Sequence, residues 1–375
     1  MMGNTPNIRF KGFTDDWEQR KFPEFVSFYN GLTYTPNDIQ EMGTLVLRSS
    51  NVKNGEIVDA DNVYVNDKVA TSENVQVGDI IVVVRNGSRA LIGKHAQIKA
   101  SMPNTVIGAF MSGIRSGQSS FVNALLDTSA FENEIAKNMG ATINQITGYM
   151  FSKMEFMVPS EEEQQQIGQY FSNLDHLITL HQRKCDETKK LKKFMLQKMF
   201  PKKDEKKPEI RFAGFTDDWE QRKLVDVVDV RSGRDYKHLE EGDIPVYGTG
   251  GYMLSVNEAL SDDEDAIGIG RKGTIDNPYI LRAPFWTVDT LFYAVPLDKY
   301  DLNFVFDIFQ NVNWKAKDES TGVPSLSKAT INAVETLMPE YAEQKKIGEY
   351  FSNLDNFITL HRRAYYNEKG ELTNV

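Results

Sequence analysis

The 375-residue chain is long enough for two ordinary domains, and its 40% hydrophobic and 26% charged residues are typical of globular proteins. The single cysteine, Cys185, excludes an intramolecular disulfide and a cysteine-based zinc cluster. The first ten residues show no basic segment followed by an apolar one, and the most apolar strand-like run, residues 80–84, is too short to span a bilayer. These features predict a cytoplasmic protein without a signal peptide.

The net charge of −10 argues against a nucleic-acid partner unless the cations are concentrated locally. Residues 80–126 contain no acidic residue. The cations in this interval are Arg85, Arg89, Lys94, Lys99 and Arg115. Such a segment favours a basic face that binds phosphates, with chance clustering on a solvated surface as the plainer alternative.

Two internal repeats divide the chain. Residues 8–21 read IRFKGFTDDWEQRK, and residues 210–223 read IRFAGFTDDWEQRK. Residues 163–183, EQQQIGQYFSNLDHLITLHQR, return at 343–363 as EQKKIGEYFSNLDNFITLHRR. The segments between these repeats differ in length and in sequence. Two units that repeat the same motifs in one chain are typical of a pseudo-two-fold arrangement. We therefore expect the repeated motifs to form a constant frame that presents two different surfaces.

The segments between the repeats are predicted to be rich in strands. In the first, residues 80–84 predict a buried strand, and Asn86-Gly87 predicts a hairpin turn. We align residues 85–88, RNGS, with residues 271–274, RKGT, of the second unit. An arginine beside a glycine turn can reach a guanine edge or a phosphate, although a solvated surface hairpin explains the pattern equally well. The candidate DNA-binding residues are Arg85, Asn86, Ser88, Arg89, Lys94, Arg115, Arg271, Lys272 and Thr274.

A long amphipathic helix is predicted from residue 161 to about residue 200, with Ser160 and Glu163 as a capping-box pattern. At 1.5 Å per residue it would be about 60 Å long, so it needs a partner. Its second copy, starting near Glu340, is expected to pack against it as an antiparallel coiled coil. The candidate contacts between the helices or with partner subunits are Trp17, Trp219, Ile167, Phe171, Leu174, Ile178, Ile347, Phe351, Leu354 and Ile358.

The predicted organisation has five parts. They are residues 1–158 and 210–338 as strand-rich domains, 159–200 as the first helix, 201–209 as a lysine-rich linker, and 339–375 as a shortened second helix. His181 and His361 fall on the apolar stripe of the helices, where we expect packed histidines rather than metal ligands. Phe285-Trp286 and Phe292-Tyr293 are expected in the core.

Sequence patterns for catalysis are weak. Residues 268–273 fit GxGxxG, but Pro278 and Pro284 follow where a dinucleotide site needs a helix. Residues 276–279, DNPY, lack the second proline of the adenine-methyltransferase motif, and the chain has no Walker, zinc or GxSxG signature. We therefore predict no catalytic residues, no metal site and no bound cofactor.

The alternation of two variable domains with the repeated IGxYFSNLDxxITLHxR helices and the opening IRFxGFTDDWEQRK resembles the specificity subunit of type I restriction–modification systems. The resemblance covers essentially the whole chain. It implies an α+β protein with two target-recognition domains, each reading one half of a bipartite DNA site, and two helices packed as an antiparallel coiled coil that fixes the gap.

The same resemblance implies two kinds of protein partner. Modification subunits, usually two, would use S-adenosylmethionine to methylate adenine, and restriction subunits would use ATP and magnesium to translocate and cleave DNA. Three alternatives stay open at this point: a single-chain enzyme that both recognises and modifies DNA, a coiled-coil adaptor without DNA binding, and a shortened inactive allele of the specificity subunit.

Overall fold

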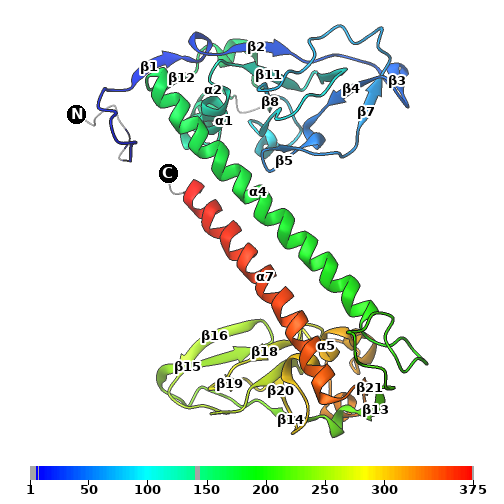
Figure 1. The fold of residues 1–375 in the computed structure, drawn as a ribbon. Coiled ribbons are helices and arrows are strands. Elements are labelled where there is room, and N and C mark those ends of the chain that lie inside the picture. The colour runs from blue at the N-terminus through cyan, green and yellow to red at the C-terminus, as the bar shows by residue number, and fades with distance from the viewer. Residues whose placement is uncertain (1–5, 7, 140–143, 374–375) are drawn as a thin grey trace. The chain divides into compact units, whose positions relative to one another are not determined.

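The computed structural model describes residues 6, 8–139 and 144–373. The remaining residues, which include most of the N-terminal segment for which no signal peptide was predicted, lie outside the described part. The chain divides into two compact units, Met1–Thr179 with Asn367–Val375 and Leu180–Tyr366 (Figure 1). No helix within the described ranges combines the length and the apolar content needed to cross a membrane.

Unit 1 contains a four-stranded antiparallel sheet of order β2-β11-β8-β9, a mixed sheet of order β10-β4-β7-β3, and the pairs β1-β12 and β5-β6. Its strands are β1 (Glu18–Lys21), β2 (Ser27–Asn30), β3 (Ile39–Gln40), β4 (Thr44–Leu47), β5 (Val52–Lys53), β6 (Glu56–Ile57), β7 (Val63–Val65), β8 (Ile80–Val83), β9 (His95–Gln97), β10 (Thr105–Ile107), β11 (Met111–Arg115) and β12 (Glu155–Val158). Its helices are α1 (Ser119–Leu126), α2 (Ser129–Asn138), α3 (Gly148–Phe151) and the first half of α4 (Glu161–Lys198).

Unit 2 repeats this plan with the sheets β14-β20-β17-β18, β16-β15-β19 and β13-β21. Its strands are β13 (Glu220–Lys223), β14 (Val228–Ser232), β15 (Glu241–Gly248), β16 (Gly251–Val256), β17 (Ala266–Gly270), β18 (Tyr279–Leu281), β19 (Trp286–Thr287), β20 (Leu291–Pro296) and β21 (Glu335–Met338). Its helices are α5 (Leu302–Asn311), α6 (Lys328–Asn332) and most of α7 (Tyr341–Thr373). The paired strands β1-β12 and β13-β21 have equivalent registers, from Glu18↔Val158 and from Glu220↔Met338.

Strand β8 is buried on both faces, as the apolar run predicts. Ile80 and Val82 belong to one hydrophobic cluster of unit 1, whereas Ile81 and Val83 belong to another. Because side chains alternate across a strand, a continuous apolar run is required when both faces are covered. The aromatic residues at 285, 286, 292 and 293 are also buried, which confirms their predicted core position.

The predicted hairpin turn at Asn86-Gly87 is wrong in detail. Strand β8 does pair antiparallel with β9, but residues 84–94 form a longer loop between them, and Gly87 does not adopt a positive φ. A two-residue turn of the predicted kind requires positive φ at both central residues. The segment is therefore a loop with room to present side chains.

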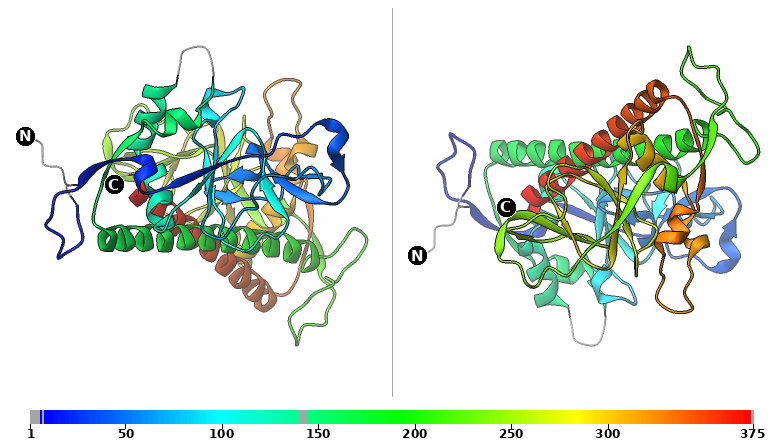
Figure 2. Two further views of the ribbon diagram at one scale, coloured as in Figure 1. Left: turned by 90° about the horizontal axis from the view of Figure 1, so that it is seen from above. Right: turned by 90° about the horizontal axis from the view of Figure 1, so that it is seen from below.

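Helices α4 and α7 are uninterrupted ribbons in every view (Figure 2). At the start of α4, Glu163 N donates to Ser160 Oγ at 3.4 Å, so half of the predicted capping box is present. The carboxylate of Glu163 does not return to Ser160 but binds Arg9 instead. The cap is thus combined with a long-range ion pair.

The second half of α4 packs antiparallel to α7 within unit 2. Successive contacts link His181 to His361, Cys185 to the carbonyl of Ile358, and Lys192 to Asp355, so residue numbers rise along one helix and fall along the other. This arrangement within unit 2 has the antiparallel sense expected of the coiled coil. Helix α4 has 38 residues and α7 has 33.

The two copies of the opening motif differ in how their tryptophan is covered. Trp219 is 2% exposed and packs against Phe200, which follows α4, and Phe304 of α5, with ring centroids 5.9 and 5.7 Å away. Trp17, its counterpart in unit 1, is only half-buried. The segment after α4 therefore completes the core of unit 2 specifically.

We expect Trp219→Ala to lower the free energy of unfolding of unit 2 by about 3–5 kcal/mol, because it opens a large cavity in a packed aromatic cluster. Trp17→Ala is expected to destabilise unit 1 less. Hydrogen exchange of peptides from each unit, measured by mass spectrometry, would assign each loss. Equal losses at the two positions would contradict this account of the packing.

The histidine pair predicts a dependence of helix pairing on pH. The Nδ1 atoms of His181 and His361 lie 2.9 Å apart, so at least one ring must be neutral to accept a hydrogen bond. Partial burial, together with the charges of His181 and Lys184, lowers the pKa of His361. The unfolded chain, with a histidine pKa of about 6.5, binds the proton more tightly, so unfolding becomes easier as the pH falls through about 6.5.

Urea unfolding of the wild type and of His361→Gln at pH 8 and pH 5.5 would measure this effect. The variant should lose part of the decrease in stability at pH 5.5. His176→Gln, at an exposed histidine on the same helix α4, is the matched control. An identical pH dependence in all three proteins would contradict the prediction.

Candidate nucleic-acid interface

The same pattern of backbone hydrogen bonds occurs at two strand ends. One is the carboxyl end of β8 in unit 1, and the other is the carboxyl end of β17 in unit 2. In unit 1, the N–H groups of Val84 and Arg85 both donate to the carbonyl of Phe110. In unit 2, the N–H groups of Arg271 and Lys272 both donate to the carbonyl of Thr290. The geometry therefore pairs Val84 with Arg271 and Arg85 with Lys272.

The bridges next to these residues follow the same correspondence. Arg85 bridges Gln145, just before α3, and Lys272 bridges Ser325, just before α6. The sequence alignment that paired Arg85 with Arg271 is consequently wrong by one residue. It placed the arginines opposite each other because they are identical, whereas the backbone hydrogen bonds determine the true register.

Arg85 is exposed at the end of β8. Its guanidinium lies 5.1 Å from the ring centroid of Phe110, a residue that is 55% exposed. An arginine over an aromatic ring is held in a defined orientation while its donors remain available. The side chain therefore presents a positive, planar group at the loop that links β8 to β9.

In unit 2 the equivalent place is a shallow pocket with several cations. Arg271, Lys272 and Lys328 line it together with Glu319. Arg271 and Lys272 are exposed, and Arg271 also donates to the carbonyl of Asp289 at 3.3 Å. The excess of positive charge in this pocket suits a phosphate or a guanine edge.

The other predicted residues near these two places hold the loops or lie exposed on them. Asn86 Oδ1 accepts from Ser88 N at 3.0 Å, and Asn86 Nδ2 donates to Ser49 Oγ at 3.3 Å. Lys94 Nζ lies 3.5 Å from the carbonyl of Ser49. Ser88, Arg89 and Thr274 are exposed, and Lys99 forms an ion pair with Glu56.

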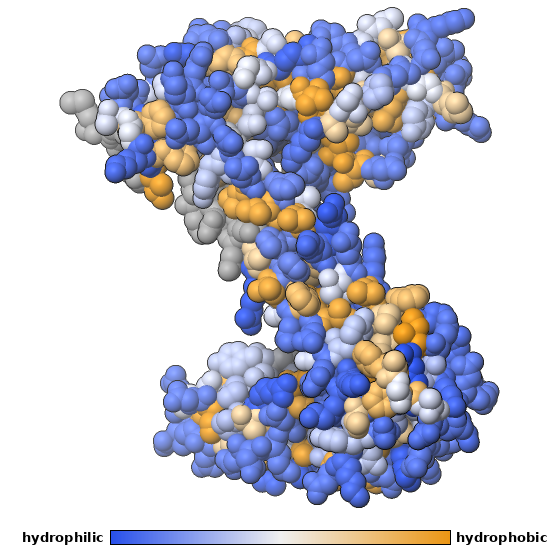
Figure 3. All heavy atoms as spheres, viewed as in Figure 1, coloured by the Kyte–Doolittle hydropathy of each residue, from blue (hydrophilic) through white to orange (hydrophobic). Residues whose placement is uncertain are grey.

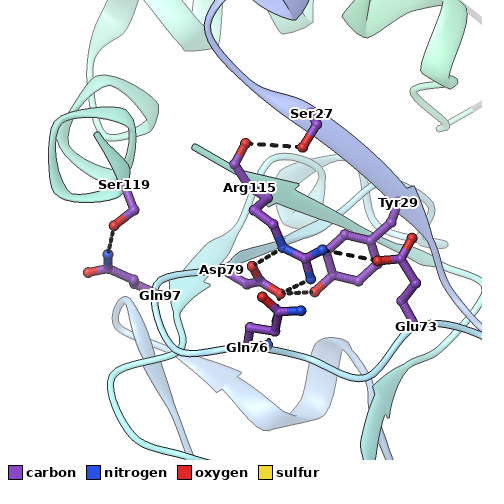
Figure 4. Close-up of polar contacts among 8 residues, drawn as sticks. All are labelled: Ser27, Tyr29, Glu73, Gln76, Asp79, Gln97, Arg115 and Ser119. Atoms are coloured by element: carbon purple, nitrogen blue, oxygen red, sulfur yellow. Dashed lines mark hydrogen bonds and ion pairs between the residues drawn. The ribbon is translucent and has the colours of Figure 1, made fainter. Parts of the chain in front are cut away.

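Arg115 does not belong with these exposed cations. Its Nε and Nη2 donate to the two oxygens of Asp79 at 2.8 Å each, and its Nη1 donates to Glu73 at 3.0 Å (Figure 4). Tyr29 OH also donates to Asp79, and its ring packs against Gly113, where a Cβ atom would overlap it. Arg115 is thus half-buried and held by two carboxylates, unlike Arg85, which is exposed.

The buried carboxylate of Asp79, 1% exposed, is the centre of this network. Burial alone would raise its pKa, but the hydrogen bonds from Arg115, from the backbone of Gln76 and from Tyr29 lower the pKa overall. The hydrogen bonds that Arg115 makes to Asp79 and Glu73 raise the pKa of Arg115, and burial beside Asp79 raises the pKa of Tyr29. All of these groups are therefore held in their ordinary charge states at neutral pH.

The opening motif is attached to the long helices by a repeated ion pair. Arg9 Nε and Nη2 bind Glu163 at 2.7 Å each, and Arg211 binds Glu343 with the same two distances. Both glutamates are buried. Sequence reasoning missed this contact, although both partners recur in both repeats and that recurrence was the available signal.

The predicted helix contacts divide into two groups. Ile347, Phe351 and Leu354 belong to the main hydrophobic cluster of unit 2, and Ile167 packs on that of unit 1. These residues attach each helix to its own domain. The others lie along α4 and α7, with Leu174 buried and Phe171, Ile178 and Ile358 half-buried.

Two further observations concern the binding of a dinucleotide cofactor and of a metal ion. Strand β17, which carries the GxGxxG pattern, is followed by a loop and then by β18, so the strand–helix geometry of a dinucleotide site is not formed there. Within the described ranges, no group of three or more histidine, cysteine, aspartate or glutamate side chains is arranged to hold a metal ion.

Comparison with known families decides the classification. The family described as type I restriction modification DNA specificity domain matches residues 14–190 and again residues 216–368. The chain belongs to this family. The two matches correspond to the two units of the internal repeat, and the resemblance drawn from the sequence is confirmed.

Individual relatives are distant. The type I restriction enzyme MjaVIII specificity subunit of Methanocaldococcus jannaschii is 25% identical over 270 residues, which cover 61% of each chain. The EcoKI specificity subunit of Escherichia coli is 24% identical over 169 residues, covering 43% of this chain and 36% of that protein. The alignments thus span less than two thirds of these relatives.

A solved structure supports the fold over the whole chain. The S subunit of a type I restriction–modification system from M. genitalium matches with a TM-score of 0.73 at 15% identity, covering 100% of this chain and 97% of that one. The α+β architecture, with two strand-rich domains and long helices, is confirmed. At this identity the likeness establishes the fold alone.

We expect Arg115→Ala to lower the free energy of unfolding by about 3–5 kcal/mol, because it leaves the buried carboxylate of Asp79 without its cation. Arg85→Ala is expected to change stability by no more than about 0.5 kcal/mol, since its side chain is exposed. Urea unfolding of both variants would test this contrast. A small loss for Arg115→Ala would mean that the network around Asp79 is not structural.

Proposed function

We propose that this chain is the DNA-recognition subunit of a type I restriction–modification complex, with each unit reading one half of a bipartite site. The observation that carries the proposal is that one repeated frame presents different exposed cations at the same strand end. Arg85 occupies that place in unit 1, and Lys272, beside Arg271, occupies it in unit 2. Two domains that share a backbone frame but present different side chains are suited to reading two different DNA sequences.

The long helices suit a role as spacer and as docking surface for partners. Helix α4 runs from unit 1 into unit 2, so it joins the two reading domains through continuous secondary structure. Large apolar side chains are exposed along α4 and α7 (Figure 3), among them Leu177, Leu191, Phe194, Phe357 and Leu360. Exposed apolar side chains on a helix are suited to contact with a partner protein.

In this proposal the chain itself is not a catalyst and acts in the cytoplasm. Modification subunits bound to the helices methylate adenine with S-adenosylmethionine, and restriction subunits use ATP and magnesium for translocation and cleavage. Affinity for DNA then comes from the assembled complex, so a net charge of −10 on this subunit is tolerated.

Co-expression with the modification subunit, followed by mapping of methylated adenines across the host genome, tests the proposal. The expected result is a new bipartite motif with a fixed internal gap. DNA binding by the complex should also weaken steeply with added salt, as phosphate contacts require. A soluble complex without DNA binding would point to an adaptor, and DNA binding without methylation would point to an inactive allele.

Single substitutions should act on one half of that motif each. We expect Arg85→Ala to relax or weaken recognition of one half-site and Lys272→Ala to affect the other, each by about 1–3 kcal/mol if a base is contacted. Arg85→Lys separates the two kinds of contact, because lysine keeps a phosphate contact but loses a two-pronged one. Lys137→Ala, on α2, is the control. Weaker recognition of both half-sites after one substitution would contradict the proposal that each unit reads one half-site.

A further inference from the structure

The cation pocket of unit 2 also contains a carboxylate that attraction to phosphates does not explain. Glu319 lines this pocket, whose volume is about 440 Å³, together with Arg271, Lys272 and Lys328. The side chain of Glu319 is exposed, and in the described part of the chain it forms no ion pair with any of these cations. A carboxylate on a surface that receives phosphates lowers the affinity for every DNA sequence, so its presence there needs a reason.

The turn that carries Glu319 is held by its own hydrogen bonds. Asp318 Oδ1 accepts from the N–H groups of Ser325 and Ser320 at 2.9 Å each. These bonds lower the pKa of Asp318, so its carboxylate is ionised and closes the turn at neutral pH. Glu319 N donates to the carbonyl of Ser325 at 3.2 Å. The backbone of Glu319 therefore has a defined position.

The carboxylate of Glu319 is oriented by one hydroxyl group. Ser327 Oγ donates to Glu319 Oε1 at 3.2 Å and accepts from Thr330 N at 3.1 Å, as the N-cap of α6. Leu326 N donates to the carbonyl of Arg271 at 3.0 Å, so this segment is bonded to the strand end that carries the cations. The second oxygen, Oε2, accepts no hydrogen bond from the residues that the structure describes, and it is available to a ligand.

Unit 1 provides an internal comparison. Ile146 N donates to the carbonyl of Val84 at 2.8 Å, which is the bond that Leu326 makes in unit 2. Glu319 stands seven residues before Leu326, whereas Met139 stands seven residues before Ile146 and is buried in the core of unit 1. The carboxylate is therefore a feature of the surface that unit 2 presents and is not required by the shared frame.

We propose, resting on the proposed function, that Glu319 reads the amino group of a cytosine in the half-site of unit 2. An ionised carboxylate only accepts hydrogen bonds, and cytosine presents only its N4 amino donor in the major groove. Guanine and thymine present acceptors there, which repel a carboxylate, and adenine presents an acceptor beside its donor. Arg271 and Lys272 suit the guanine of the same base pair or of a neighbouring one.

Selection of bound duplexes from a random-sequence library by the complex with the modification subunit, followed by sequencing, tests this assignment without requiring methylation. The wild type should select cytosine at one fixed position of one half-site. Glu319→Ala should reduce that preference by about tenfold or more and leave the other positions unchanged. Glu319→Gln should shift the preference toward adenine, whose N6 and N7 a glutamine side chain can bind together. Glu258→Gln, at another exposed glutamate of unit 2, is the control and should leave the selected motif unchanged.

The affinity of the same complexes for a duplex without the selected motif separates base reading from a structural role. Glu319→Ala should bind this duplex more tightly than the wild type, because a negative charge that faces phosphates is removed, and added salt should reduce the difference. Unchanged or weaker binding of this duplex, or loss of preference across the whole half-site, would overturn the assignment. An unchanged motif in both Glu319 variants would also overturn it alone, whereas a wild type that selects no motif would overturn the proposed function as well.

Discussion

The architecture depends on a repeated ion pair. In each unit, an arginine of the opening motif binds a glutamate in the first turn of the long helix. Each guanidinium binds its carboxylate through two bonds of 2.7 Å, and the glutamates are buried. A buried carboxylate without its cation would be strongly destabilising, so neither partner can change alone. The carboxylate also lies where the helix dipole favours negative charge.

This contact fixes the start of the helix relative to the domain that precedes it. The same strands that follow the arginines, β1 and β13, pair with β12 and β21, which lead directly into α4 and α7. Gly168 and Gly348 then bring the helices within contact of the backbone of α1 and α5, where a side chain would not fit. The ion pair, the strand pair and the close approach of each long helix to α1 or α5 together define a frame that the two divergent domains share.

Local patterns predicted the parts of the fold that depend on nearest neighbours. The repeat, the long helices, the buried strand and the buried aromatic pairs all follow from periodicity and composition. The loop after β8 was mispredicted because residues 84–94 depend on long-range contacts, such as Asn86 with Ser49 and with Asn144, that outweigh the Asn-Gly preference. The alignment of the two strand ends failed for a related reason. One identical arginine is a weaker indication of structural equivalence than the pattern of backbone hydrogen bonds.

The site was predicted less completely than the fold, because charge in a sequence does not reveal pairing. Arg115 stands in the same acid-free interval as Arg85, yet only Arg115 reaches Asp79 and Glu73, which precede that interval. Whether a cation is exposed or neutralised is decided by where the strands place it. Sequence could therefore name the basic segment but not the residue within it that remains available.

Local placement of charge also resolves the apparent conflict between an acidic chain and a DNA partner. In the part of the chain that the structure describes, Arg9, Arg115 and Arg211 are bound to carboxylates, whereas Arg85 and Lys272 have no such partner. At physiological ionic strength, charges more than about 8 Å apart in solvent are largely screened. A phosphate that approaches either strand end would therefore sense the adjacent cations far more strongly than the net charge, and the recognition that we propose depends on these two places rather than on the overall composition.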